Sequence, residues 1–116
     1  MTRTPSPRTT SYVAEILRLY CLLPDTPDRP RPLDRRLAAA FEQRRVPLDL
    51  LGAAFILGTA RRTFSASAPL PAIRSLHYFL PVLEEVQQQP LDPGYLEHLR
   101  RRLSATSSSA AFQQWR

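Results

Sequence analysis

The chain has 116 residues, of which 43% are hydrophobic and 22% are charged. This composition is typical of a globular domain and argues against a wholly disordered chain or a membrane protein. The longest apolar run, 50–60, is far shorter than the roughly 20 residues that cross a bilayer, and the first ten residues lack the apolar segment of a signal peptide. We therefore expect one soluble, cytoplasmic domain that makes no membrane contact.

Arginine supplies all 16 basic residues, and the net charge is +6. A GC-rich coding bias is the simpler reason for the lack of lysine, although forked guanidinium groups also suit phosphate recognition. The positive surplus remains under either explanation. It indicates attraction to nucleic acid or to another polyanion.

The first predicted helix follows a polar tail over 1–9, which we expect to be disordered. Ser11 suits its N-cap and Pro24 ends it. Residues 24–32 then hold four prolines in nine positions, which predicts a stiff, extended connector. The apolar positions at helical spacing are Val13, Ile16, Leu17, Tyr20 and Leu23.

A second helix is expected over 34–45, with Asp34 as its N-cap. Its narrow apolar stripe, formed by Leu37, Ala40 and Phe41, is typical of a helix on the surface.

The third predicted helix begins after Pro47 and closes in an arginine pair. Residues 48–57 are apolar on nearly every side, which indicates a buried helix at the centre of the fold. Gly52 and Gly58 would let neighbouring elements approach it closely. The side chains that we expect to be buried include Leu48, Leu51, Phe55 and Ile56, with Phe55 in the middle of the core.

Residues 70–86 combine apolar side chains with a proline in mid-segment. Pro81 has no amide hydrogen, and its ring crowds the carbonyl of His77, so a straight helix through it would lose about 3 kcal/mol. We expect a kink or two short helices. The expected core face consists of Ile73, Leu76, Leu80 and Leu83, with Phe79, Val82 and Val86 beside it.

A fifth helix is expected over 95–103, where Leu96, Leu99 and Leu103 recur at helical spacing and the outer surface is basic. No segment has the alternating pattern of a strand. We therefore predict an all-α protein, a small bundle of about five helices around a buried central helix. The expected division is a tail over 1–9, a single domain over 10–103 that contains the connector 24–32, and a flexible tail over 104–116.

No arrangement typical of catalysis or metal binding is present, and we expect no enzyme activity, no cofactor and no metal site. His77 and His98 are far apart in the sequence, and we expect His77 to be partly buried and bonded to the backbone and His98 to be exposed. The adjacent Glu84 and Glu85 would point in different directions on a helix. Cys21 is the only cysteine, which excludes an intrachain disulfide, and we expect its thiol to be buried.

The second and third predicted helices meet across a short turn, as the helices of a helix-turn-helix do. A recognition helix must offer polar side chains to base edges. Because residues 48–57 are apolar, we favour two packed helices of a bundle.

Arginines at helix ends and on outer faces are the candidate phosphate contacts. They would bind nucleic acid by charge with little sequence discrimination, DNA ahead of RNA, whereas ordinary solvated charge is the alternative. The competing class is a protein-interaction or assembly subunit without nucleic-acid contact. The candidate nucleic-acid-binding residues are Arg61, Arg62, Arg100, Arg101 and Arg102.

Two aromatic residues close to the end of the sequence, Phe112 and Trp115, follow a Ser/Ala-rich stretch at a spacing of three. They are candidate partner-binding residues, because aromatic anchors supply much of the energy of many interfaces. Packing onto the parent domain is the favoured alternative, and base stacking is a third.

The run "AFEQRRVPLDLLGAAFILGTARRTF", together with "PLPAIRSLHYFLPVLEEV", resembles the C-terminal helical segment of DnaD-like proteins, the replication-initiation and primosome proteins of bacterial chromosomes and mobile elements. The likeness covers about fifty residues. A winged-helix region usually precedes this segment in that group, and these 116 residues do not include one. The resemblance implies an accessory role in DNA replication, with nucleic acid, a replication or mobile-element protein, or a second copy of the chain as partner.

Overall fold

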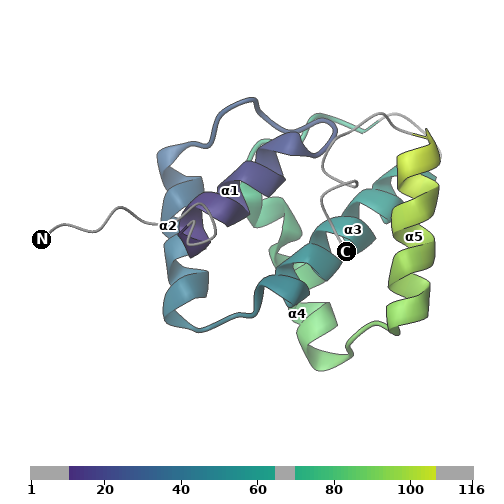
Figure 1. Cartoon of the computed structure of the whole chain (residues 1–116). Helices are drawn as coiled ribbons and strands as arrows, with labels where there is room; N and C mark the ends of the chain where they lie inside the picture. The colour runs from purple at the N-terminus through teal and green to yellow at the C-terminus, as the bar shows by residue number, and fades with distance from the viewer. Residues whose placement is uncertain (1–10, 65–69, 107–116) are drawn as a thin grey trace, which may run out of the picture.

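The computed structural model describes residues 11–64 and 70–106. Within these two ranges the chain forms five α-helices, one 3-10 turn and no β-strand, so the predicted all-α bundle is confirmed. The elements are α1 (Tyr12–Leu22), α2 (Pro32–Gln43), α3 (Leu48–Phe64), the 3-10 turn η2 (Leu76–Phe79), α4 (Leu80–Gln88) and α5 (Pro93–Thr106) (Figure 1).

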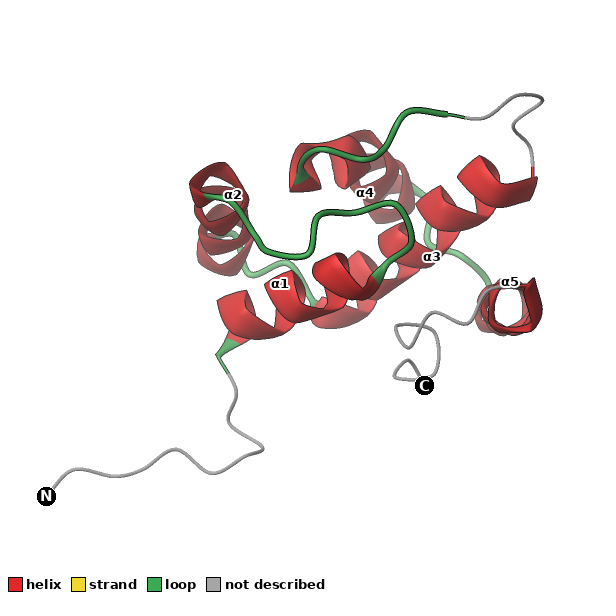
Figure 2. Ribbon diagram, turned by 90° about the horizontal axis from the view of Figure 1, so that it is seen from above, coloured by secondary structure: helices red, strands yellow, loops and turns green. Residues whose placement is uncertain are grey.

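α3 runs through the middle of the molecule, with α2 at one edge and α5 at the other (Figure 1). α1 packs against α2 and α3, whereas α4 and α5 each pack against α3. Figure 2 shows α5 nearly end-on beside α3, away from α1 and α2. The two halves of the bundle are therefore joined through α3.

The burial of α3 confirms the prediction of a central helix. Every residue from Leu51 to Ala60 is buried, and Phe55 has no exposed surface. Leu48 was expected in the core, but 37% of its surface is exposed, because it is the first residue of α3 and precedes the buried stretch. Burial on all sides is what a uniformly apolar helix requires.

α1 begins and ends as its sequence predicts. The Ser11 hydroxyl accepts the backbone amide of Ala14 at 3.0 Å, which makes it the N-cap, and the helix ends at Leu22, before Pro24. Ile16, Leu17, Tyr20 and Leu23 are buried as expected, whereas Val13 is only half-buried.

The start of α2 differs from the prediction. The helix begins at Pro32, which suits a first helical position because proline has no amide hydrogen to satisfy there. Asp34 is therefore not the N-cap but a residue of the first turn, fully buried, whose carboxylate accepts the Arg31 amide at 2.9 Å. The helix ends at Gln43, two residues earlier than expected.

The chain bends before Pro81, as predicted, and forms η2 followed by α4. Phe79, which we placed beside the core face, is instead central: its ring meets Tyr20 and Phe55 edge-on, with centroids 6.3 Å and 5.1 Å away. A Cβ at Gly58 would lie 2.9 Å from two carbons of this ring. The glycine therefore allows α3 to approach η2 closely. Leu80, expected on the core face, is only half-buried.

α5 reaches Thr106, three residues beyond the expected end of the domain. Leu99 and Leu103 are buried against the core, whereas Leu96 is half-buried. The expected disordered tails lie mostly outside the described residues.

Candidate nucleic-acid interface

Arg61, in the last turn of α3, holds the carboxylate of Glu85 on α4 through both terminal nitrogens. Nη1 donates to Oε2 at 2.8 Å. These hydrogen bonds raise the pKa of Arg61 and lower the pKa of Glu85. An exposed pair of this kind contributes little to stability, but it places a negative charge beside the guanidinium that a phosphate would approach.

Arg62 is held inside the molecule, with only 7% of its side chain exposed. Its guanidinium contacts the carboxylate of Asp25, 3.5 Å away, and the hydroxyl of Tyr78. It also donates to the backbone carbonyls of Leu70 and Pro71. Arg62 therefore ties α3 to the connector after α1 and to the segment before η2, and little of it faces solvent.

The arginines of α5 are also engaged within the domain. Arg100 and Arg101 donate to Glu97 through Nε at 2.9 Å and 3.0 Å. Hydrogen bonds, first from Arg100 and then from Arg101, lower the pKa of Glu97 to about 2. The guanidinium carbon of Arg102 lies 4.1 Å from the centre of the Phe64 ring, a cation–π contact.

The five arginines selected from the sequence are not gathered into one positive surface. Arg61 and Arg102 line the same groove, which also holds two carboxylates, those of Glu85 and Asp92. Arg100 lines a separate depression that again contains two carboxylates. Acidic side chains therefore alternate with these arginines.

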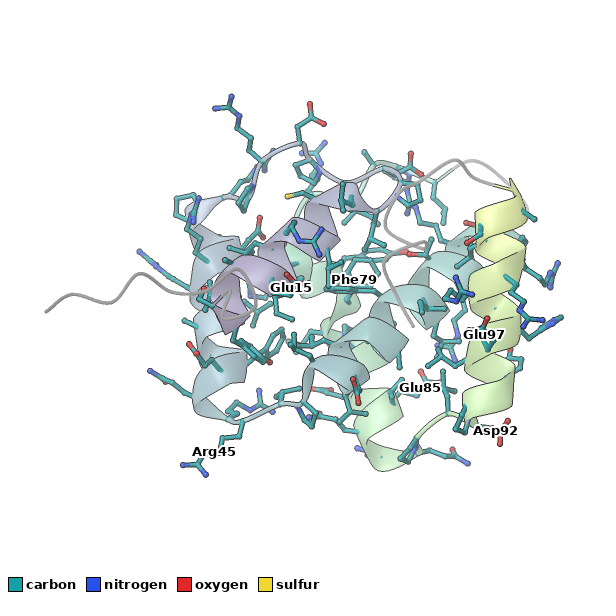
Figure 3. The ribbon with its side chains drawn as sticks, viewed as in Figure 1. Glu15, Arg45, Phe79, Glu85, Asp92 and Glu97 are labelled. Carbon is teal, nitrogen blue, oxygen red and sulfur yellow. The ribbon has the colours of Figure 1, made fainter. Side chains whose placement is uncertain are left out.

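Besides Arg31 at its N-cap, four arginines lie at the two ends of α2: Arg35 and Arg36 near its start, Arg44 at its C-cap and Arg45 directly after it. We call them the α2 arginine surface. All four are exposed, and none forms an ion pair within 11–64 or 70–106. Arg45 has a left-handed backbone, with φ of 58°, and Figure 3 shows its side chain pointing away from the body of the protein.

The charge balance of 29–45 is the sequence signal that could have identified this surface. The segment holds six arginines and only two acidic residues, Asp34 and Glu42. Asp34 is buried and accepts backbone amides. Glu42 is then the one acidic side chain of this segment on the surface, so a local positive excess remains there.

A groove of about 480 Å³ opens between α3, α4 and α5. Its charged rim includes Arg61, Glu85 and Arg102. Phe112 and Trp115, the candidate partner-binding residues, lie outside the described residues. The apolar lining of the groove includes Leu57, Phe64, Val86, Leu91 and Leu99.

The remaining reactive side chains do not form a site. His77 is exposed, contrary to expectation, because it lies on the outer side of η2, and His98 is exposed as predicted. Cys21 is half-buried, not fully buried, and burial raises the pKa of its thiol. Across the described part of the chain, no three His, Cys, Asp or Glu side chains are grouped as metal ligands would be.

Within 11–64 and 70–106, no helix combines the length and apolar character that crossing a bilayer requires. No protein-family model matches the chain, and neither does any curated protein or solved structure.

Proposed function

We propose that the chain is a non-catalytic binding module that holds the phosphate backbone of nucleic acid through the α2 arginine surface. The observation that supports this proposal is that the four guanidinium groups of this surface are exposed and form no ion pair with another described residue. Guanidinium groups donate forked hydrogen bonds that fit phosphate oxygens. Each contact also releases a counterion, which favours binding at low salt.

The proposal places the binding arginines on α2 and not on α3 and α5. Arg62 has little free surface, and Arg61, Arg100 and Arg101 would each have to share or give up a carboxylate partner. The arginines of α2 have no ion pair to give up within the described residues, although Arg35 lines a depression that also contains Asp28. A role in DNA replication is proposed only because the sequence resembles DnaD-like proteins.

The test is the salt dependence of binding to a 24-base-pair DNA duplex, measured by fluorescence anisotropy. The variant R35Q/R36Q/R44Q/R45Q should lower the magnitude of the slope of log K against log[salt] by up to about 3.6, at about 0.9 for each lost phosphate contact. The matched control, R61Q/R100Q/R101Q/R102Q, removes the same charge and should change the slope much less. An equal effect of the two variants would assign binding to net charge, and no binding by the wild type would refute the proposal.

A second candidate function is protein–protein interaction, which the groove between α3, α4 and α5 favours. Aromatic side chains fill apolar grooves well, and Phe112 and Trp115 are the aromatic anchors that this chain offers. Trp115 is the only tryptophan. A blue shift of its emission that grows with protein concentration, and that Leu91→Arg at the half-buried edge of the groove abolishes, would support docking of one copy on another. A shift independent of concentration would mean packing onto the parent domain, and an unshifted emission would count against docking.

A further inference from the structure

The α2 arginine surface is divided into two pairs at opposite ends of one helix. Arg35 and Arg36 lie near the start of α2, and Arg44 and Arg45 lie at its end. Between the pairs, residues 37–41 carry no charge, and the exposed Glu42 and Gln43 precede the second pair. At 1.5 Å of rise and 3.6 residues per turn, the nine positions from one pair to the other correspond to about 13.5 Å along the helix axis and half a turn around it, so Arg35 and Arg44 lie on opposite sides of α2.

We propose that the two pairs hold opposite strands of a double helix, so that α2 bridges the groove between them. This inference rests on the proposed function and adds its substrate class, duplex in place of single-stranded nucleic acid. The major groove of B-DNA is about 12 Å wide, which matches the separation of the two pairs. A single strand offers one line of phosphates and no second strand across a groove.

The middle of α2 supports contact with backbones and not with bases. Ala38 and Phe41 are buried, and the neighbouring positions Leu37, Ala39 and Ala40 are half-buried. These side chains carry no donor or acceptor for a base edge. Phosphate contacts fix the position of a protein on a duplex but carry no sequence information by themselves. Binding should therefore depend little on sequence, with Gln43 as the exposed amide of α2 that could reach a base edge.

The placement of aromatic residues also favours a duplex. Proteins that bind single strands combine a basic groove with aromatic side chains on which bases stack. The exposed aromatic residues of the described chain, Tyr78 and Tyr95, lie on η2 and α5. α2 itself has only Phe41, which is buried. No stacking surface therefore accompanies the four arginines on α2.

The experiment compares three probes of one random sequence: a 24-base-pair DNA duplex, its single strand, and the same duplex with neutral methylphosphonate linkages in one strand. Anisotropy titrations at several salt concentrations give, for each probe, the slope of log K against log[salt]. We expect the one-sided neutral duplex to halve the salt slope, because one arginine pair loses its phosphates. If both pairs contact one strand, the protein will bind the charged strand with the same slope and about a twofold statistical loss, which would overturn the inference.

Two half variants complete the test. R35Q/R36Q and R44Q/R45Q should each reduce the slope on the normal duplex by a similar amount and should lower the preference for duplex over single strand. The matched control R101Q/R102Q removes the same charge and should keep that preference. A preference unchanged in both half variants would contradict bridging while leaving the proposed function intact, provided that the fourfold variant still lowers affinity. Absence of binding to every probe would refute both.

Discussion

Asp34 on α2 and Leu76 at the start of η2 are joined by a buried hydrogen bond, in which the Leu76 amide donates to Oδ1 at 2.9 Å. The other carboxylate oxygen accepts the amide of Arg31, also at 2.9 Å. Asp34 has no exposed surface. One side chain therefore holds the first turn of α2 and also fixes the segment that leads into α4.

Replacement of Asp34 should destabilise the whole domain. Asp34→Ala leaves two amides without their acceptor, and an unsatisfied buried donor costs about 1–3 kcal/mol, so we expect a loss of about 3 kcal/mol in the free energy of unfolding. Asp34→Asn keeps one acceptor oxygen and should cost less. Urea denaturation followed by circular dichroism measures both. Wild-type stability in the alanine variant would show that the carboxylate is dispensable.

Gly58→Ala should also destabilise the protein, although alanine normally favours a helix by about 1 kcal/mol. The added Cβ would meet the Phe79 ring at 2.9 Å, and that ring is already packed against Tyr20 and Phe55. Overpacking of a core costs about 1–3 kcal/mol. For scale, Phe55→Ala should cost about 3–5 kcal/mol. A thermal melt in which Gly58→Ala gains stability would mean that α3 and η2 are less closely packed than described.

Arg62→Lys should loosen the segment before η2 even though it keeps the charge. Lysine has one ammonium group in place of the planar fork that contacts Asp25, Leu70 and Pro71 together. Ile73 reports on this segment, because its amide donates to the Asp25 carbonyl at 2.7 Å. We expect faster hydrogen exchange at Ile73 in the variant, measured by NMR. The matched replacement Arg61→Lys, at an exposed ion pair, should leave that rate nearly unchanged.

The pH dependence of stability should reveal the arginine pairs on α5. In the folded chain the pKa of Glu97 lies at about 2, below the ordinary value of 4.5. The ionised carboxylate therefore stabilises the fold at neutral pH, and this contribution is lost as the pH falls from about 4.5 to 2. The Tm difference between the wild type and Glu97→Gln should shrink across this range. Glu84→Gln is the matched control, and a constant difference for Glu97→Gln would contradict the pairing.

Local patterns predicted the elements of the fold well. The spacing of Ile16, Leu17 and Tyr20 located α1, and the missing amide of Pro81 located the break before α4. The role of Asp34 could not be predicted in the same way. A carboxylate near a helix start can serve at the N-cap or in the first turn, and its partner at Leu76 is 42 positions away.

The difference between local and long-range contacts also explains why the sequence pointed to the arginines of α3 and α5 as phosphate contacts. The pairs that Glu97 forms with Arg100 and Arg101 follow from helical spacing. The partners of Arg61 and Arg62 are 24 and 37 positions away and appear only in the folded chain. The arginines predicted as phosphate contacts are therefore engaged within the fold, whereas those of α2 form no ion pair with a described residue.

NMR of the arginine side chains tests the central claim most directly. With protein labelled with nitrogen-15, each assigned Nε–Hε signal can be followed as a DNA duplex is added. The signals of Arg35, Arg36, Arg44 and Arg45 should shift in a saturable way, whereas that of Arg62 should stay in place. Shifts confined to Arg61, Arg100, Arg101 and Arg102, or no shifts at any arginine, would contradict the assignment of phosphate binding to α2.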